Sequence, residues 1–317
     1  MIAEVNGIRL AYSDTAASGH VHSDAGHPAL TRSDAAEAGL TQSEIRDREL
    51  ARSDAAEAGL NCSDTGVGSP VVLLVHGFVL NRSMWDPQLG SLKAAGARVI
   101  APDLRGFGAS EAGPPGPLTM EQHADDLAAL LDVLGVREPV VYVGLSMGGY
   151  AGFAFWQRFS SRVRALVLAD TRATADSPEH RAWRLAMAEQ AEAVGSSQPA
   201  IDGMLPRFFS WTLRPGSVVE QTARRMVAGT SARAVADGHR GMALRPDSSA
   251  LLGSIDVPTL VVVGEHDVLT TPADARVIAD GVPGARLVSI DQAGHLSNME
   301  NPEAFNEALL SFIRQEG

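Results

Sequence analysis

Residues 140–149 place a serine between an apolar run and a helical pattern. The stretch reads Val-Val-Tyr-Val-Gly-Leu-Ser-Met-Gly-Gly, and the helical pattern continues from Tyr150 to Phe159. This order predicts a strand, a tight turn and a helix, with Ser146 at the apex of the turn. Gly144 and Gly148 flank it at two positions to either side, which suits a strained turn where backbones crowd together. Because a serine hydroxyl is a weak nucleophile, it needs a base, an orienting acid and donors for an oxyanion.

The candidate base is His295, in the sequence Gly294-His295-Leu296. It lies between an apolar run that ends at Ile290 and a helical pattern that begins near Pro302. A loop in this position is expected at the carboxyl end of a parallel sheet, on the same side as Ser146. The imidazole would take the proton from the Ser146 hydroxyl and later return it to the leaving group.

Two aspartates are candidates for the acid. Asp267 follows the apolar run Leu260–Val263, and Asp170 follows the run Ala165–Leu168. Each is expected at a strand end on the active side of the sheet. We favour Asp267 as the residue that orients His295 and stabilises its charged form, and Asp170 remains the competitor.

The oxyanion needs two backbone N–H groups that point to one place. Met147 supplies the first, because it follows the nucleophile at the start of a helix. The second is expected from the loop after Val71–Val75, where Gly77 lets the chain bend and Phe78 donates. We interpret His76 as a brace for this loop through hydrogen bonds.

The elements that must position these residues alternate along the chain. Two short strands joined by Asn6-Gly7 are followed by buried strands separated by helical patterns. This order predicts an α/β fold with a mostly parallel sheet and helices on both faces. The eight expected strands are Ile2–Val5, Ile8–Tyr12, Val71–Val75, Arg98–Ala101, Val140–Val143, Ala165–Leu168, Leu260–Val263 and Arg286–Ile290.

Residues 13–62 interrupt this alternation with a ten-residue repeat. The nine residues Arg32–Leu40 recur unchanged as Arg52–Leu60. The segment has too few large apolar residues to form a core, so we interpret it as a tandem expansion inserted in a surface loop. A separate role as an interaction module stays open. Three histidines in it could bind a metal, but we interpret them as surface residues: His20, His22 and His27.

Residues 171–253 form a second interruption and are expected to be a helical cap on the sheet. We therefore divide the chain into an α/β core, residues 1–170 and 254–317, and this cap. The cap has ten arginines against eight acidic residues, which hints at an anionic substrate or at a solvated arginine-rich face. Its large apolar residues either line a pocket or pack the cap helices together, and both readings stay open for Trp183, Met187, Met204, Phe208, Phe209 and Trp211.

Composition excludes several classes of function. The net charge of −12 argues against nucleic acid and anionic membrane as partners. No apolar run approaches the roughly 20 residues that a membrane helix needs, and the amino terminus has no signal-peptide pattern. The single cysteine, Cys62, is compatible with a reducing cytoplasm. We expect a cytoplasmic enzyme that needs no metal or organic cofactor; its oligomeric state stays open.

Taken together, these motifs resemble the α/β-hydrolase superfamily. The resemblance rests on the serine turn, on the order serine, acid, histidine, and on four stretches: His76-Gly77-Phe78, residues 103–110, residues 264–267 and Gly294-His295. Within the superfamily, residues 169–172 and 294–302 are similar to the carboxylesterase and 3-oxoadipate enol-lactonase-like branch. The resemblance implies an eight-stranded sheet whose second strand runs antiparallel. The inserted repeats would then lie away from the catalytic side of the sheet.

This resemblance implies hydrolysis of small carboxylic esters through an acyl-Ser146 intermediate. One alternative is an enol-lactonase whose cap arginines, Arg181 or Arg184, hold an anionic substrate. A second is cleavage of C–C or thioester bonds by the same residues. A third is a ligand receptor on the same fold. The expected partner in the enzymatic readings is a small ester or lactone.

Overall fold

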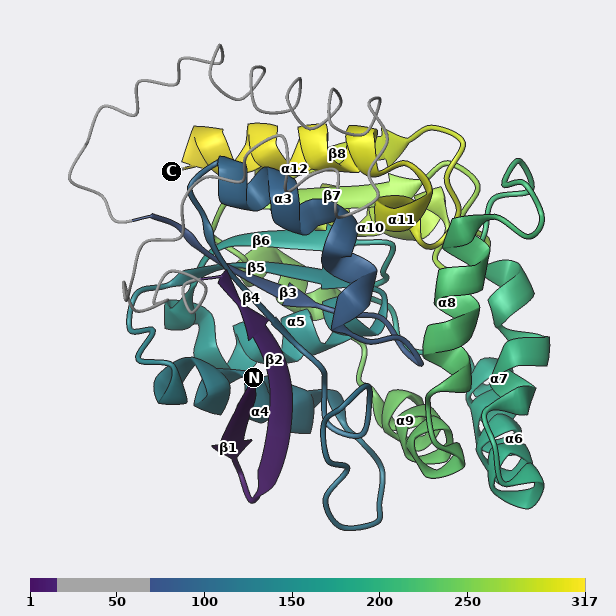
Figure 1. Cartoon of the computed structure of the whole chain (residues 1–317). Coiled ribbons are helices and arrows are strands. Elements are labelled where there is room, and N and C mark those ends of the chain that lie inside the picture. The colour runs from purple at the N-terminus through teal and green to yellow at the C-terminus, as the bar shows by residue number, and fades with distance from the viewer. Residues whose placement is uncertain (16–68, 317) are drawn as a thin grey trace, which may run out of the picture. The chain divides into compact units, whose positions relative to one another are not determined.

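Eight strands form a single sheet in the order β1-β2-β4-β3-β5-β6-β7-β8 (Figure 1). The computed structural model describes residues 1–15 and 69–316. Strand β2 runs antiparallel to both of its neighbours, and all other neighbouring strands from β4 to β8 are parallel. The strands are β1 (Ile2–Val5), β2 (Ile8–Asp14), β3 (Val71–Val75), β4 (Arg98–Pro102), β5 (Val140–Leu145), β6 (Val163–Ala169), β7 (Thr259–Gly264) and β8 (Arg286–Ile290).

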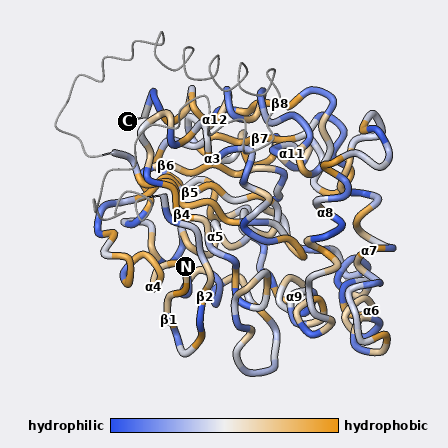
Figure 2. Tube along the Cα trace, in the orientation of Figure 1, coloured by the Kyte–Doolittle hydropathy of each residue, from blue (hydrophilic) through white to orange (hydrophobic). Residues whose placement is uncertain are grey.

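The predicted α/β architecture is confirmed, and the eight expected strands appear with ends that shift by at most two residues. Every residue of β3, β5 and β7 is buried, as their continuous apolar sequences indicated. Figure 2 shows the hydrophobic residues concentrated along these central strands. Strand β2 continues to Asp14, because Asp14 pairs with Ile100 of β4. It therefore extends two residues into the segment that we interpreted as the insertion.

Helices cover both faces of the sheet. Helices α3 (Asp86–Ala94) and α12 (Pro302–Glu316) pack together on one face, and α4 (Met120–Val133) and α5 (Met147–Phe159) pack together on the other (Figure 1). Helix α10 (Pro272–Gly281) contacts β7 and β8. Within the described residues, no helix is both long and apolar enough to cross a membrane. Short helical segments complete this part of the chain: η2 (Arg82–Trp85), η3 (Ser160–Arg162) and α11 (Ser297–Glu300).

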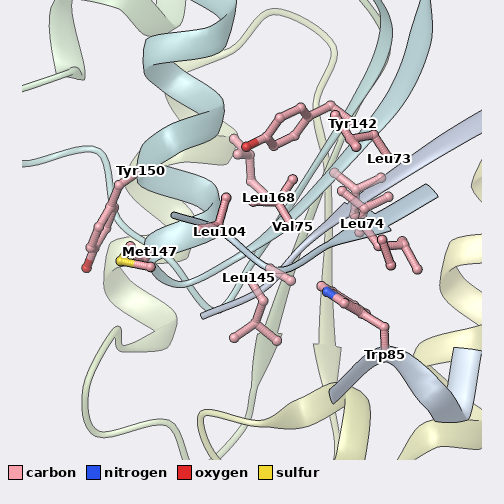
Figure 3. Packing of buried hydrophobic residues seen from close by; sticks show 14 of the residues in the cluster. Leu73, Leu74, Val75, Trp85, Leu104, Tyr142, Leu145, Met147, Tyr150 and Leu168 are labelled. Atoms are coloured by element: carbon pink, nitrogen blue, oxygen red, sulfur yellow. The ribbon is translucent and has the colours of Figure 1, made fainter. Parts of the chain in front are cut away.

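The core between sheet and helices is continuous around the start of α5. Tyr142 lies opposite Leu73 on the neighbouring strand (Figure 3). Its buried hydroxyl donates a 2.9 Å hydrogen bond to the Gly148 carbonyl oxygen in the first turn of α5. A buried hydroxyl requires such a partner. The contact ties β5 to the helix that follows the serine turn.

The segment that we predicted to be a cap, residues 171–253, lies between β6 and β7 and is helical. It contains α6 (Pro178–Val194), α7 (Gln198–Gly203), η4 (Leu205–Arg207), α8 (Val218–Ala228), α9 (Ala232–Leu244) and η5 (Ser249–Ser254). Helices α6, α8 and α9 each begin after a serine whose hydroxyl accepts a backbone N–H from the first turn: Ser177, Ser217 and Ser231. Helix α6 packs along α9, so the two largest cap helices share one interface.

The two described ends of the insertion flank the amino end of β4. The backbone N–H of Val99 donates to the Thr15 hydroxyl at 2.8 Å, and the N–H of Arg98 donates to the Pro70 carbonyl at 3.0 Å. Strand β4 is parallel to β3, and β3 to β5, so its amino end lies at the edge of the sheet opposite to Ser146. The repeats themselves, with His20, His22 and His27, lie outside the described residues.

We expect a variant that lacks residues 16–65 to fold and to keep any ester-hydrolysis rate within a few-fold of the full chain. The physical reason is that Thr15 and Pro70 bind adjacent residues of β4, Val99 and Arg98, and that shortening a loop changes its closure entropy only slowly. Thermal unfolding by circular dichroism, with a midpoint within about 5 °C, would accompany the rate measurement. A folded deletion variant whose turnover collapses would contradict this expectation.

Candidate active site

Ser146 lies in a strained turn between β5 and α5. Its backbone has φ 55° and ψ −113°, a conformation that costs a non-glycine residue on the order of 1–3 kcal/mol. The turn has no room for a side chain at Gly144 or at Gly148. A Cβ on Gly144 would lie 2.3 Å from the Gly148 carbonyl oxygen, and one on Gly148 would lie 2.2 Å from that of Val75. The small residues seen in the sequence are therefore required by close backbone approach.

The structure brings the three predicted residues Ser146, His295 and Asp267 into one hydrogen-bonded chain. His295 Nε2 lies 2.9 Å from Ser146 Oγ, and His295 Nδ1 lies 2.8 Å from Asp267 Oδ2. The residues follow the carboxyl ends of β5, β8 and β7, which are neighbours or near neighbours in the parallel part of the sheet. His295 and Asp267 are buried, and Ser146 is half-buried. This order of partners can pass a proton from the hydroxyl to the imidazole.

Asp267 is held as a carboxylate by its surroundings. Burial alone would raise its pKa, but the charge and hydrogen bond of His295, together with Thr270, hold the pKa below the usual range. Thr270 donates its hydroxyl to Oδ2 at 2.7 Å and its backbone N–H to Oδ1 at 3.0 Å. The sequence reasoning missed Thr270. An aspartate that binds the backbone two and three residues ahead is a common local motif, so the spacing could have indicated it.

Asp170, the competing acid, has another set of partners. It is buried after β6, where it accepts the Gly264 N–H at 2.8 Å and the Ser297 hydroxyl at 2.5 Å. Burial raises the pKa of Asp170 well above its usual range, and the charge of Asp267 raises it further. No hydrogen bond joins Asp170 to His295 within the described part of the chain. Asp170 therefore links the two loops that carry Asp267 and His295, without contacting the imidazole.

A third carboxyl group, that of the half-buried Glu300 in α11, ties the His295 loop to the cap. Its two oxygens accept the backbone N–H of Gly294 at 2.9 Å and of Ser210 at 2.8 Å. Burial raises the pKa of Glu300 to about 7, although these N–H donors oppose the shift. Ser210 Oγ also lies 2.6 Å from His266 Nδ1, a second serine–histidine contact. Neither residue of that pair lines the cavity at Ser146.

The loop after β3 is braced in the way that the sequence indicated. The Leu104 N–H donates to His76 Nε2 at 2.9 Å, so His76 Nδ1 carries the proton and donates to the Gly77 carbonyl at 2.8 Å. The Phe78 ring packs against Phe107 and His239, with centroids at 5.8 and 4.7 Å. The loop thus connects the core to cap helix α9.

The two amides expected at the oxyanion, those of Phe78 and Met147, donate to no other described residue. Both residues are buried, and Met147 begins α5 directly after Ser146. Figure 3 shows Met147 at the base of this helix, next to Leu145 and Tyr150. Unpaired N–H groups at a helix start favour a negative charge nearby.

A cavity of about 260 Å³ opens at Ser146 and His295. Three of the apolar residues named from the sequence line it: Trp183, Met204 and Phe208. Three others lie outside its lining. Met187 faces Gly203 of α7, Phe209 packs partly buried beside the core, and Trp211 is 82% exposed and stacks on His266. Sequence spacing could not separate these groups, because Trp183 and Met187 share helix α6 and the other four residues lie outside any helix.

The sequence reasoning missed most of the polar lining. Arg172, His180 and Arg207 line the cavity, as does Arg184, whereas Arg181 is exposed and lies outside it. The arginine excess in residues 171–253 was the available signal. Among the described residues, no cluster of three or more His, Cys, Asp or Glu side chains is arranged to hold a metal ion.

Comparisons with known proteins agree with this fold. A profile of the Alpha/beta hydrolase family matches residues 72–308. The chain is 30% identical over 252 residues to 3-oxoadipate enol-lactonase 2 of Acinetobacter baylyi, covering 78% of this chain and 89% of that protein.

Two solved structures share the fold along the whole chain. One is a thermophilic esterase from Thermogutta terrifontis with malate bound, at a TM-score of 0.77 and 35% identity, covering 99% of this chain and 97% of that one. The other is the enol-lactonase from Burkholderia xenovorans LB400, at a TM-score of 0.76 and 28% identity, covering 99% and 100%. The fold, the site and these relatives together place the chain in the alpha/beta hydrolase family, as a hydrolase.

Proposed function

We propose that this hydrolase cleaves small carboxylic esters through an acyl-Ser146 intermediate. The observation that carries the proposal is the hydrogen-bonded chain in which His295 lies 2.9 Å from Ser146 Oγ and 2.8 Å from Asp267. A nucleophile, a base within hydrogen-bond reach and an acid that orients the base are the parts that acyl transfer needs.

In the proposed mechanism, His295 Nε2 takes the Ser146 proton while Oγ attacks the ester carbonyl. Asp267 keeps the proton on Nδ1 and stabilises the imidazolium that forms. The amides of Phe78 and Met147 bind the developing oxyanion. The imidazolium then protonates the leaving alcohol. Water, activated by the same imidazole, releases the acid, so the chain and water supply every group that the scheme uses.

The comparisons support this class of bond, since the relatives include an esterase and enol-lactonases. The cavity of about 260 Å³ suits a small acyl group. The second candidate function is lactone hydrolysis, which the two enol-lactonases favour. An enol-lactone and a linear ester pass through the same acyl-serine step, so the site alone is compatible with both.

Replacing Ser146 with alanine should lower turnover of a 4-nitrophenyl ester by about 10⁴-fold or more, because the nucleophile is removed. A fluorophosphonate probe should label the wild type and not this variant. The matched control is Ser210→Ala, which removes the other serine that contacts a histidine. That control should keep both labelling and turnover. Labelling that follows Ser210, or activity that survives in Ser146→Ala, would contradict the mechanism.

A substrate series distinguishes the two candidate bonds. We expect kcat/KM to be highest for esters with short acyl chains, because the cavity is small. An enol-lactone measured beside the esters gives the comparison. A kcat/KM for the lactone that exceeds the best ester by more than about 100-fold would identify the protein as a dedicated lactonase.

Asp170→Asn should retain turnover and should be at least as stable as the wild type at pH 7. In the wild type, the unfolded chain loses the Asp170 proton near pH 4, whereas the buried folded group keeps it to higher pH. Its contribution to stability is therefore full below about pH 4 and declines as the pH rises toward the raised pKa. The free energy of unfolding of Asp170→Asn, measured with urea, should therefore exceed that of the wild type by an amount that increases over this pH range.

Asp170→Ala is the contrasting variant. It leaves the Gly264 N–H and the Ser297 hydroxyl without their partner and should cost about 1–3 kcal/mol for each group. Its turnover should fall, because the loops that carry Asp267 and His295 would no longer be held in alignment.

An Asp170→Asn variant that loses stability relative to the wild type as the pH rises would mean that Asp170 is ionised in the folded protein.

A further inference from the structure

The lining of the cavity at Ser146 carries positive charge, whereas the whole chain is negatively charged. The chain has a net charge of −12, yet the described residues that line the cavity include three arginines and no aspartate or glutamate. Desolvated walls make such an excess effective, because the field is screened less than at an open surface. The question is then whether each arginine is already neutralised by a partner.

Arg184 is neutralised only in part. Its Nε donates to Asp176 Oδ2 at 2.5 Å, but its Nη1 has a methionine sulfur, that of Met242, at 3.4 Å. Arg245 uses the same carboxylate, with Nη2 at 3.0 Å from Asp176 Oδ1. One carboxylate thus serves two guanidinium groups, and the pair of arginines keeps a net positive charge.

Arg172 also has unused donor capacity. Its Nη2 donates to the Leu269 carbonyl oxygen, and the nearest carboxylate oxygen, on Asp274, is 3.9 Å away. Its buried Nε has no hydrogen-bond partner among the described residues. A buried N–H without a partner costs free energy unless a ligand or water satisfies it.

Of the three arginines that line the cavity, Arg207 is the one whose guanidinium makes no hydrogen bond or ion pair with another described residue. It ends the short helix η4 and is exposed at the cavity. A guanidinium has five N–H donors in a planar fork that fits a carboxylate with two parallel hydrogen bonds.

The pKa of His180 is affected by the positive charge of these arginines. Burial lowers its pKa, and the charges of Arg184, Arg172 and Arg207 lower it further, while Asp176 alone raises it. Four basic side chains therefore line the cavity, and the carboxylates that pair with them, Asp176 and Asp274, lie outside its lining.

We propose that this cavity accepts substrates with a free carboxylate in addition to the ester or lactone bond, and that Arg207 determines this specificity by binding that carboxylate. The inference rests on the proposed function, since it describes the substrate of the same site. Arg172 and Arg184 contribute field and further donors. Hydrolysis adds one water across the acyl bond and gives a product with a second carboxylate, while the first stays on Arg207.

The test compares two substrates that differ in one charge: mono-4-nitrophenyl glutarate and its methyl ester. The wild type should have a higher kcat/KM for the monoanion, and this preference should decline as the salt concentration rises. In Arg207→Gln, the ratio of kcat/KM for the monoanion to that for the methyl ester should fall at least tenfold, mainly through KM. Arg207→Lys should restore part of the ratio, because it keeps the charge and loses the fork.

Arg181→Gln is the matched control. It removes the same charge from the same cap, and both arginines are exposed, but Arg181 does not line the cavity, so the ratio should stay within about twofold of the wild type. The proposal is overturned if Arg207→Gln leaves the ratio unchanged, or if Arg181→Gln lowers it equally. Ser146→Ala separates the two levels: if it hydrolyses both substrates normally, the proposed function fails. If Ser146→Ala hydrolyses neither substrate and Arg207→Gln keeps the wild-type ratio, only the proposed carboxylate site is contradicted.

Discussion

The positive φ of Ser146 is the constraint on which the rest of the site depends. The conformation persists because β5, the first turn of α5 and the end of β3 crowd around it. The Tyr142 hydroxyl, buried in the core, fixes the Gly148 carbonyl on one side of the turn. The cost of the strained residue is offset by packing in the most buried part of the sheet. In return, the serine hydroxyl stands clear of its own backbone and meets an imidazole from a distant loop.

Two aspartates at adjacent strand ends show how surroundings separate similar groups. Asp267 and Asp170 follow β7 and β6, which pair in the sheet. Asp267 receives donors from the imidazole, from Thr270 and from backbone amides, which keep its pKa low despite burial. Burial raises the pKa of Asp170, and the charge of Asp267 raises it further, although the two donors that Asp170 receives oppose this shift. A raised pKa favours the neutral form of Asp170, which would avoid two buried anions at one site.

The cap connects the site to substrate through charge as well as shape. Helix α6 supplies Trp183 and the short helix η4 supplies Arg207 to the cavity. The neighbouring loops supply Arg172, Met204 and Phe208. Glu300 joins the cap loop at Ser210 to the loop of His295, so the wall of the cavity and the base share one anchor. Movement of this loop would therefore change both the fit of a ligand and the position of the imidazole.

The sequence by itself determined the strand order along the chain, the serine turn, and the set of loops from which base and acid must come. These features are local, because apolar periodicity and the close approach of Gly144 to Gly148 act within a few residues of one another. Tertiary structure decided which aspartate meets Nδ1, since Asp170 and Asp267 have equivalent places at strand ends and differ only in partners far away in sequence. It also decided which aromatic residues face the cavity and which arginine keeps its donors free, because a helix face and a guanidinium acquire their partners only when the cap and the sheet come together.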